Sequence, residues 1–254
     1  MSQFKSIDEV IAALGNIIHE AEHNYDTSGY FAALYRKVTA KVKSGIENNF
    51  FEDGPRMEKL VVVFANRYLD AYFAFKKKEP ISRSWERAFN LSNTYRPIVL
   101  QHLLMGMNAH INLDLGIAAA EISKNKNIDD LENDFNKINE ILASLVNEVQ
   151  YDLSKIWPTL RWVLKITMKV DDFLVHFSME KSRNGAWKFA KSIAENQTGN
   201  YDTLVLERDI KVAEKSKIIT RPGIIAGILL IIIRPGERGS IKYKIQKMKL
   251  VHQD

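Results

Sequence analysis

The residues best suited to chemistry lie in a 27-residue stretch, Pro97 to Ser123, that contains no lysine or arginine. Within it, His110 and Asp114 are four residues apart, so on a helix both side chains can reach one proton or one metal ion. A histidine paired with a carboxylate titrates near neutral pH, which suits proton transfer. We therefore predict that His110 is a general acid or base and that Asp114 orients it.

The polar residues of this stretch fall on two stripes of a helical wheel. With about 100° per residue, Asp114 falls beside His110. Asn108 and Asn112 fall on the opposite side. A surface helix has one broad polar face instead, and a charged residue at the centre of a membrane helix is costly. The pattern predicts a central helix of a bundle that either organises a hydrogen-bond network or faces a cavity.

A divalent metal is an alternative occupant of the His110–Asp114 pair. His102 is eight residues earlier, about 12 Å along a helix axis, which is too far to bind the same ion. A further ligand would have to come from another helix, and the candidates are Glu58, Asp70 and His176. Since the chain contains no cysteine, such a metal would be held by nitrogen and oxygen ligands alone. A purely structural His–Asp hydrogen bond is the third interpretation.

Two arginines extend the predicted site. Arg67 follows an apolar stretch, which predicts a buried counter-charge for Asp114 or Glu121 in the fork geometry that arginine offers. Arg183 lies one helical turn from Trp187 and would line the same pocket. We predict that the two arginines hold an anionic group of a small-molecule substrate. The remaining hydrogen bonds would come from His102, Asn108 and Asn112.

A second motif, His19-Glu20-Ala21-Glu22-His23, matches the HExxH pattern of zinc peptidases. That pattern places two imidazoles on one helix face, with the glutamate as general base. Here it lies close to the first residue, without a preceding strand to hold a peptide and beside polar residues typical of a solvated helix end. Chelation of stray metal is therefore a better interpretation than proteolysis.

Helical periodicity dominates the chain, and we predict an all-α, single-domain multi-helix bundle around the central apolar helix. The domain spans 1–237, and 238–254 forms a basic C-terminal tail that is a helix or a short strand. Ile224–Ile233 is apolar but has half the length of a membrane span. The other predicted helices are Ile7–Ala21, Tyr30–Phe50, Pro55–Phe75, a short helix with Trp85 and Phe89, Ile128–Ile156, Asp171–Glu195 and Asp202–Ile218.

The composition is ordinary for a globular protein, with 254 residues, 46% hydrophobic and 26% charged. The net charge of +5 comes from patches such as Lys76–Lys78 and Lys242–Lys249, which match no nucleic-acid module, so we predict no nucleic-acid partner. Without a glycine-rich phosphate loop, we predict no nucleotide cofactor. Neither cysteine nor a secretory signal is present, so we expect a cytoplasmic protein.

Five stretches resemble an uncharacterised bacterial family with fungal members, whose reaction is not established. They are Leu34–Thr39, Met57–Leu69, Ser84–Phe89, Leu100–Gly116 and Phe177–Trp187, and Asn-Ala-His-Ile-Asn-Leu-Asp-Leu-Gly at 108–116 is the most specific. The resemblance spans Ile7 to Glu237 and implies a fold and a candidate site without an activity. The residues it brings forward are Arg36, Glu58, Arg67, Trp85, His102, Asn108, His110, Asn112, Asp114 and Arg183. It leaves out the His19–His23 motif and the tail after Gly239, which we expect to be peripheral.

These observations lead to three functional hypotheses. The first is a hydrolase-like enzyme in which His110, Asp114, Arg67, Asn108 and Arg183 do the chemistry. Its substrate would be bound by His102, Asn112, Arg36 and Trp85. The second is a non-catalytic protein that binds a small or lipid-like ligand. The third is a structural His–Asp network without an active site.

Overall fold

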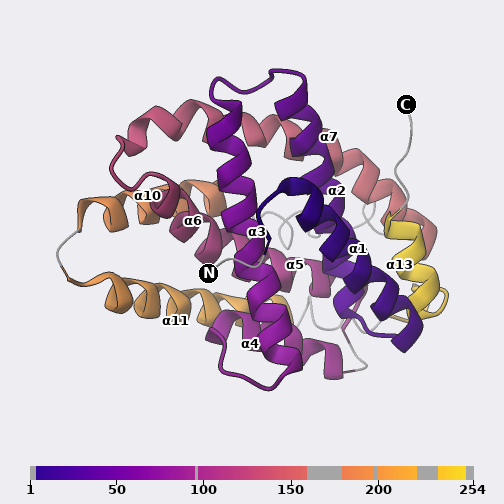
Figure 1. Cartoon of the computed structure of the whole chain (residues 1–254). Coiled ribbons are helices and arrows are strands. Elements are labelled where there is room, and N and C mark those ends of the chain that lie inside the picture. The colour runs from indigo at the N-terminus through magenta and orange to yellow at the C-terminus, as the bar shows by residue number, and fades with distance from the viewer. Residues whose placement is uncertain (1–3, 95–96, 159–178, 197–198, 222–233, 250–254) are drawn as a thin grey trace.

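The computed structural model describes residues 4–94, 97–158, 179–196, 199–221 and 234–249. Within these ranges the chain forms helices and no strand, which confirms the all-α prediction. The helices are α1 (Ile7–Asn24), α2 (Ser28–Glu47), α3 (Gly54–Lys76), α4 (Arg83–Asn90), α5 (Val99–Ala109), α6 (Leu115–Ile122), α7 (Glu132–Ile156), α10 (Met179–Glu195), α11 (Tyr201–Thr220) and α13 (Ile241–Lys249). In Figure 1, α3 runs through the middle, with α6, α10 and α11 on the left and α1, α2 and α13 on the right.

Local capping chemistry explains where several helices begin. The Ser6 hydroxyl accepts a hydrogen bond from the Glu9 backbone N–H, and the Glu9 carboxylate accepts one from the Lys5 backbone N–H. At the start of α3, Asp53 accepts from the Arg56 backbone N–H, and a proline occupies the first turn. Side-chain acceptors at these positions satisfy amides that have no partner within the helix. The predicted starts of these two helices agree with the structure to within a residue.

The stretch with neither lysine nor arginine is helical from Val99 to Ile122 but changes its winding in the middle. Helix α5 leads into a π-helical turn, η2 (His110–Asp114), which leads into α6. The Leu115 N–H donates to the His110 carbonyl, five residues earlier rather than four. Such π turns are rare, and they occur frequently at functional sites. The two candidate residues His110 and Asp114 are the first and last residues of this turn.

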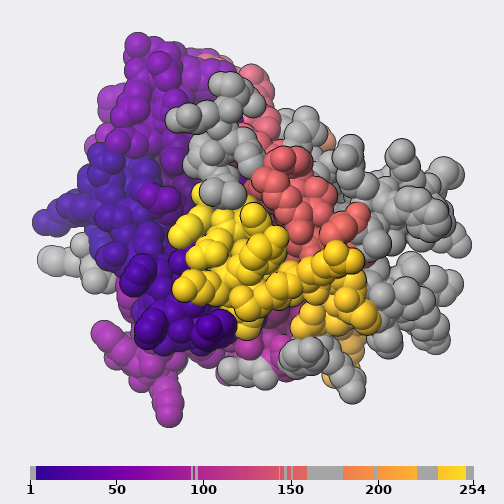
Figure 2. Space-filling view, turned by 90° about the vertical axis from the view of Figure 1, so that its right-hand side faces the viewer, coloured from indigo at the N-terminus to yellow at the C-terminus, as the bar shows by residue number. Residues whose placement is uncertain are grey.

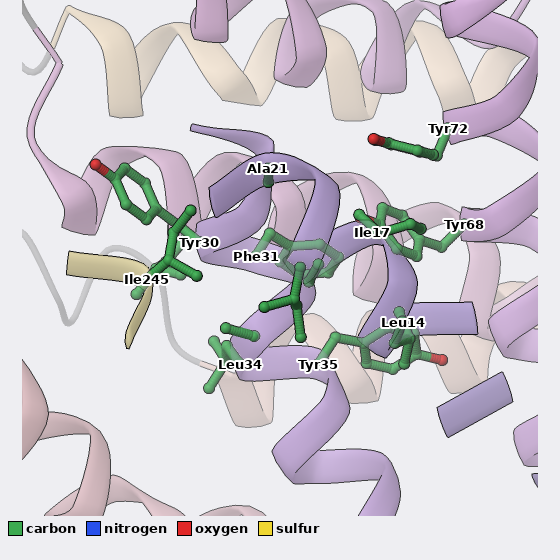
Figure 3. Packing of buried hydrophobic residues seen from close by; sticks show 14 of the residues in the cluster. Leu14, Ile17, Ala21, Tyr30, Phe31, Leu34, Tyr35, Tyr68, Tyr72 and Ile245 are labelled. Atoms are coloured by element: carbon green, nitrogen blue, oxygen red, sulfur yellow. The ribbon is translucent and has the colours of Figure 1, made fainter. Parts of the chain in front are cut away.

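The hydrophobic core has two main parts that meet along α3. One part is built mainly from α1, α2, α3, α4 and α5, and it is rich in aromatic rings such as Phe31, Tyr68 and Trp85. Figure 3 shows Phe31 near the centre of this part, between Tyr30 and Tyr68. The other part is built mainly from α3, α6, α7 and α10, with Phe135 and Trp187 in contact. The central helix stretch therefore has packed neighbours on all sides.

The part of the basic C-terminal tail that the structure describes joins the core, so the expectation that this part is peripheral is wrong. Residues 241–249 form α13, in which Ile245 is fully buried and Met248 is 2% exposed. In the space-filling view, this segment, drawn in yellow, covers part of the indigo N-terminal helices and borders the end of α7 (Figure 2). Apolar residues at 241, 245 and 248 recur with helical spacing, which explains why the segment is a helix.

No helix in the described ranges has the length and apolar character needed to cross a membrane. The apolar segment Ile224–Ile233 and the first part of the predicted helix from Asp171 lie outside those ranges.

Candidate functional site

The carboxylate of Asp114 is the centre of the candidate site, and three side chains from three elements converge on it. Arg67 Nε, on α3, lies 2.9 Å from Oδ1. Trp85 Nε1, on α4, donates to Oδ2 at 2.8 Å. His110 Nδ1, on η2, lies 3.2 Å from the same Oδ2. The structure thus brings together four predicted residues, and it selects Asp114 rather than the exposed Glu121 as the partner of Arg67.

The surroundings of Asp114 keep its carboxyl group ionised. The side chain is only 1% exposed, and burial alone would raise its pKa. Arg67, His110 and Trp85 outweigh burial and hold the pKa of Asp114 below its ordinary value. Arg67 is the member of this group that reaches solvent, since its side chain is 30% exposed.

The imidazole of His110 is neutral at pH 7 and has a defined tautomer. Burial lowers the pKa of His110, although Asp114 acts in the opposite direction. Because Asp114 is an ionised acceptor, the proton of the neutral ring lies on Nδ1, between the two side chains. Nε2 then carries a lone pair, and it is buried without a hydrogen-bond partner. Nε2 is therefore the ring nitrogen that can accept a proton.

Aromatic rings enclose this imidazole. Phe64 stacks on it at a centroid distance of 3.6 Å, and Tyr35 meets it edge-on at 4.5 Å. Phe31, Tyr68 and Trp85 lie about 6 Å away. The hydroxyls of Tyr35 and Tyr68 are also buried without partners. Buried polar atoms of this kind are uncommon, and three of them belong to one cluster.

The other side of the π turn is held by helix α11. Asn112 Nδ2 donates to Asn108 Oδ1 at 3.2 Å, and Asn108 Nδ2 donates to the Val212 carbonyl at 3.0 Å. Arg208 Nε donates to the Asn112 carbonyl at 2.8 Å. Asn108 and Asn112 therefore lie on the stripe opposite His110, as the helical wheel predicts. They attach the turn to α11 and do not face the Asp114 group.

Distant carboxylates hold the starts of α3 and α4, which bring Arg67 and Trp85 to Asp114, and the start of α5, which leads into the π turn. Asp134 of α7 accepts from the backbone N–H groups of residues 52 and 53, before α3. Asp209 of α11 accepts from the backbone N–H groups of residues 83 and 84, in the first turn of α4. Glu237 accepts from the Val99 N–H at the start of α5. Carboxylates are favourable at helix N-termini, so each bond fixes the position of a helix that supplies the site.

Two predicted arginines lie away from Asp114. Arg36 is half-buried, and its Nε donates to the Ile11 carbonyl of α1. Arg183 is buried against α7, where its guanidinium lies over the Phe135 ring and donates to the Phe135 carbonyl. Burial lowers the pKa of Arg183 to about 10. Both contacts attach one helix to another, so Arg183 does not share a pocket with Arg67.

The candidate metal ligands are likewise not assembled. Glu58 is exposed, whereas His110 and Asp114 are buried. His19 and His23 are exposed on α1. In the part of the chain that the structure describes, no three His, Asp or Glu side chains form a group that could hold a metal ion. His176 falls outside that part.

Comparison with protein families supplies an identification for most of the chain. A model described as a family of unknown function, DUF5995, matches residues 7–222. The chain belongs to the DUF5995 family. No curated protein and no solved structure matches it. The DUF5995 match contains every residue of the Asp114 group and ends before Glu237 and α13.

The aromatic rings around His110 also have a signal in the sequence, which the spacing of the polar residues alone does not reveal. Phe31 and Tyr35 are four residues apart on α2, and Phe64 and Tyr68 are four apart on α3. Aromatic pairs with this spacing lie on one helix face, and two such faces would enclose a residue placed between them. Arg208, in contrast, has no distinguishing neighbours in the sequence.

His102 lies two turns before His110 and forms an edge-on contact with Tyr30 at 5.6 Å. Burial, together with the nearby Arg234 and Lys244, lowers its pKa to about 4. An unfolded histidine has a pKa of about 6.5. Between these values the unfolded chain binds a proton that the folded chain does not, so stability falls as the pH is lowered.

Lowering the pH from 7 to 4.5 should therefore reduce the free energy of unfolding of the wild type by about 2–3 kcal/mol more than that of His102→Gln. Urea unfolding at the two pH values measures this difference. His19→Gln, at an exposed position, should retain the full dependence. If His102→Gln kept the pH dependence of the wild type, this would contradict a lowered pKa of His102 in the folded chain.

Proposed function

We propose that this chain is a hydrolase-like enzyme acting on a small molecule, with His110 as its general base and Asp114 as the group that orients it. The single observation that carries the proposal is the buried Nε2 of His110, an unpartnered base whose other nitrogen is bound to an ionised carboxylate. In this role, Nε2 takes a proton from a water molecule as its oxygen attacks the substrate, and later returns that proton to the leaving group.

The neighbouring groups support the remaining roles. Arg67 is tied to Asp114 and partly exposed, so an anionic group of a substrate would meet it at the surface. Trp85 holds the second oxygen of Asp114, which prevents rotation of the carboxylate away from the imidazole. Asn108, Asn112 and Arg208 hold the π turn from behind and act as positioning residues. Arg36, Arg183 and Glu58 have no part in this proposal.

A panel of 4-nitrophenyl acetate, butyrate and phosphate, with release of 4-nitrophenol followed by absorbance, tests the proposal. We expect turnover of at least one compound, and a loss of about 100-fold or more in His110→Gln. His19→Gln is the matched control and should keep the wild-type rate. Because burial lowers the pKa of His110, the rate should rise with pH and reach half of its plateau below pH 6.5.

Equal rates in the wild type and His110→Gln would contradict a catalytic role for His110. Absence of turnover with the whole panel, for protein shown to be folded by circular dichroism, would contradict the hydrolase-like activity.

A structural role for the pair is the second candidate, and one observation favours it. Both oxygens of Asp114 accept hydrogen bonds and the side chain is almost fully buried, as in a network that only joins helices. The melting temperature of His110→Gln separates the two roles. A change of a few degrees at most, with turnover lost, supports catalysis. A large decrease with any turnover unaffected supports the structural network.

A further inference from the structure

A small cavity lies beside the Asp114 group, between the start of α2 and helices α3, α4 and α5. Phe31, Tyr68, Trp85 and Gly106 are buried residues of its walls, and Thr27, Ser28, Ala88 and Ser92 are half-buried residues around it. Phe89 and His102 complete the lining. Gly106 is needed here, because a Cβ at this position would lie 2.4 Å from the Phe31 ring. Gly106 and His102 lie one and two helical turns before His110, so the cavity continues the stripe that carries the candidate base.

Two hydroxyl groups in the lining have no hydrogen-bond partner although they are buried: Thr27 Oγ1 and Tyr68 Oη. Tyr68 is fully buried, and burial raises its pKa well above the ordinary value, so its hydroxyl keeps its proton. Thr27 precedes the first residue of α2, yet its hydroxyl makes no capping bond. Buried hydroxyls are normally bonded to protein or to ordered water, so this end of the cavity offers hydrogen bonds to a molecule that carries a hydroxyl group.

The electrostatic character of the lining limits the kind of ligand. None of the lining residues carries a charge, since His102 is neutral at pH 7. A charged group brought here would lose its hydration without gaining a counter-charge, which is strongly unfavourable. Hydroxyl groups both donate and accept hydrogen bonds, and the best match for a set of hydroxyls is another group that does both.

The size of the cavity limits the ligand further. Its volume is about 20 Å³, and a cavity of about 10–15 Å³ already holds one water molecule. The inner part of this partly open cavity therefore accepts a single hydroxyl-sized group and not an aromatic ring. The rest of a larger ligand would extend past the half-buried residues toward solvent.

We propose that this cavity is a binding site for the hydroxyl end of a small uncharged aliphatic alcohol. The ligand hydroxyl exchanges hydrogen bonds with Thr27 and Tyr68, and its carbon atoms contact the rings of Trp85 and Phe89. Binding at this site does not depend on catalysis by His110. The site is nevertheless linked to the Asp114 group, because the Trp85 ring lines the cavity while its Nε1 holds Asp114.

Titration of ¹⁵N-labelled protein with ethanol and with ethylene glycol tests the proposal. We expect saturable shifts of the backbone amides of Thr27, Ser28 and Gly106 and of the Trp85 indole N–H. Acetate and ethylammonium, which have similar size but carry a charge, should leave these signals unchanged. Absence of saturable shifts with both alcohols, as for a cavity that holds only ordered water, would overturn the proposal. Equal responses to the charged probes would overturn it as well.

Two variants test the hydroxyl groups themselves. Tyr68→Phe and Thr27→Val each keep the shape of the residue and remove one hydroxyl, and each should weaken alcohol binding about 5–10-fold. Tyr25→Phe is the matched control, since Tyr25 is 58% exposed, and its affinity should equal that of the wild type. Wild-type affinity in both cavity variants would contradict the assignment, and these titrations give the answer whether or not the chain hydrolyses any compound.

Discussion

Replacing Asp114 by Asn is expected to lower the free energy of unfolding by about 3 kcal/mol or more. The substitution keeps the size of the side chain but removes the negative charge that Arg67 pairs with. It also turns one of the two acceptors into an NH₂ donor, which then faces the N–H of Arg67 or those of Trp85 and His110. Leaving one partner of a buried ion pair uncompensated is among the costliest single changes in a protein. Urea unfolding followed by circular dichroism measures the loss.

The matched control for this substitution is Asp8→Asn. Asp8 pairs with Lys43 at 2.5 Å, but its side chain is 72% exposed, and exposed ion pairs contribute less than about 1 kcal/mol. The difference between Asp114→Asn and the wild type should also shrink in acid. The folded pKa of Asp114 is lowered, so its contribution is full above about pH 4 and is lost as the pH falls through the folded value. Similar losses in the two variants would show that the Asp114 group contributes no more than a surface pair.

Replacing Gly116 by Ala is expected to lower the free energy of unfolding by about 2–3 kcal/mol. A Cβ at this position would lie 2.8 Å from the backbone carbonyl oxygen of Ala186 and 2.8 Å from the Phe189 ring. A backbone atom cannot rotate away as a side chain can, so α10 would have to move as a unit. Since Gly116 follows Asp114 by two residues, this movement also disturbs the π turn.

Gly15→Ala is the opposite case on helix α1. The nearest atom to a Cβ at Gly15 is Arg36 Nε at 3.7 Å, an ordinary contact distance. Alanine in a helix interior is favoured over glycine by about 1 kcal/mol, so this variant should be more stable than the wild type. If the packing is as described, urea unfolding shows a lower free energy of unfolding for Gly116→Ala and a higher one for Gly15→Ala than for the wild type. A stabilised Gly116→Ala would be incompatible with the close approach of α6 to α10.

Most of the helical architecture could be predicted from the sequence, because apolar periodicity and capping residues are local properties. Ser6, Pro55 and the apolar residues of Ile128–Ile156 each indicate a helix without reference to the rest of the chain. The π turn could not be predicted in this way. It depends on contacts from α11, above all the hydrogen bond from Arg208 to Asn112, and these are set by the tertiary fold.

The candidate site was predictable to the extent that it lies on one helix. Spacing by four residues placed His110 beside Asp114, and charge indicated Arg67 as a partner. Spacing within a helix does not say which neighbour lies across from each face. The sequence therefore predicts Arg183 in the same pocket, whereas the structure packs it on Phe135. Trp85 was brought forward only by the family resemblance, and its hydrogen bond to Asp114 needs the position of α4, which Asp209 holds.

The packing of α13 on the first helices has a consequence for how the chain folds during synthesis. Ile245 fits against Gly29, where a Cβ would lie 2.6 Å from it, yet more than 200 residues separate the two positions. At translation rates of about 5–20 residues per second, α2 is made roughly 10–40 s before the residue that covers it. During that interval the apolar surface beside Gly29 is open to other chains. We therefore expect the contact between the first and last described helices to form late, and nascent chains ending before residue 241 to be prone to aggregation.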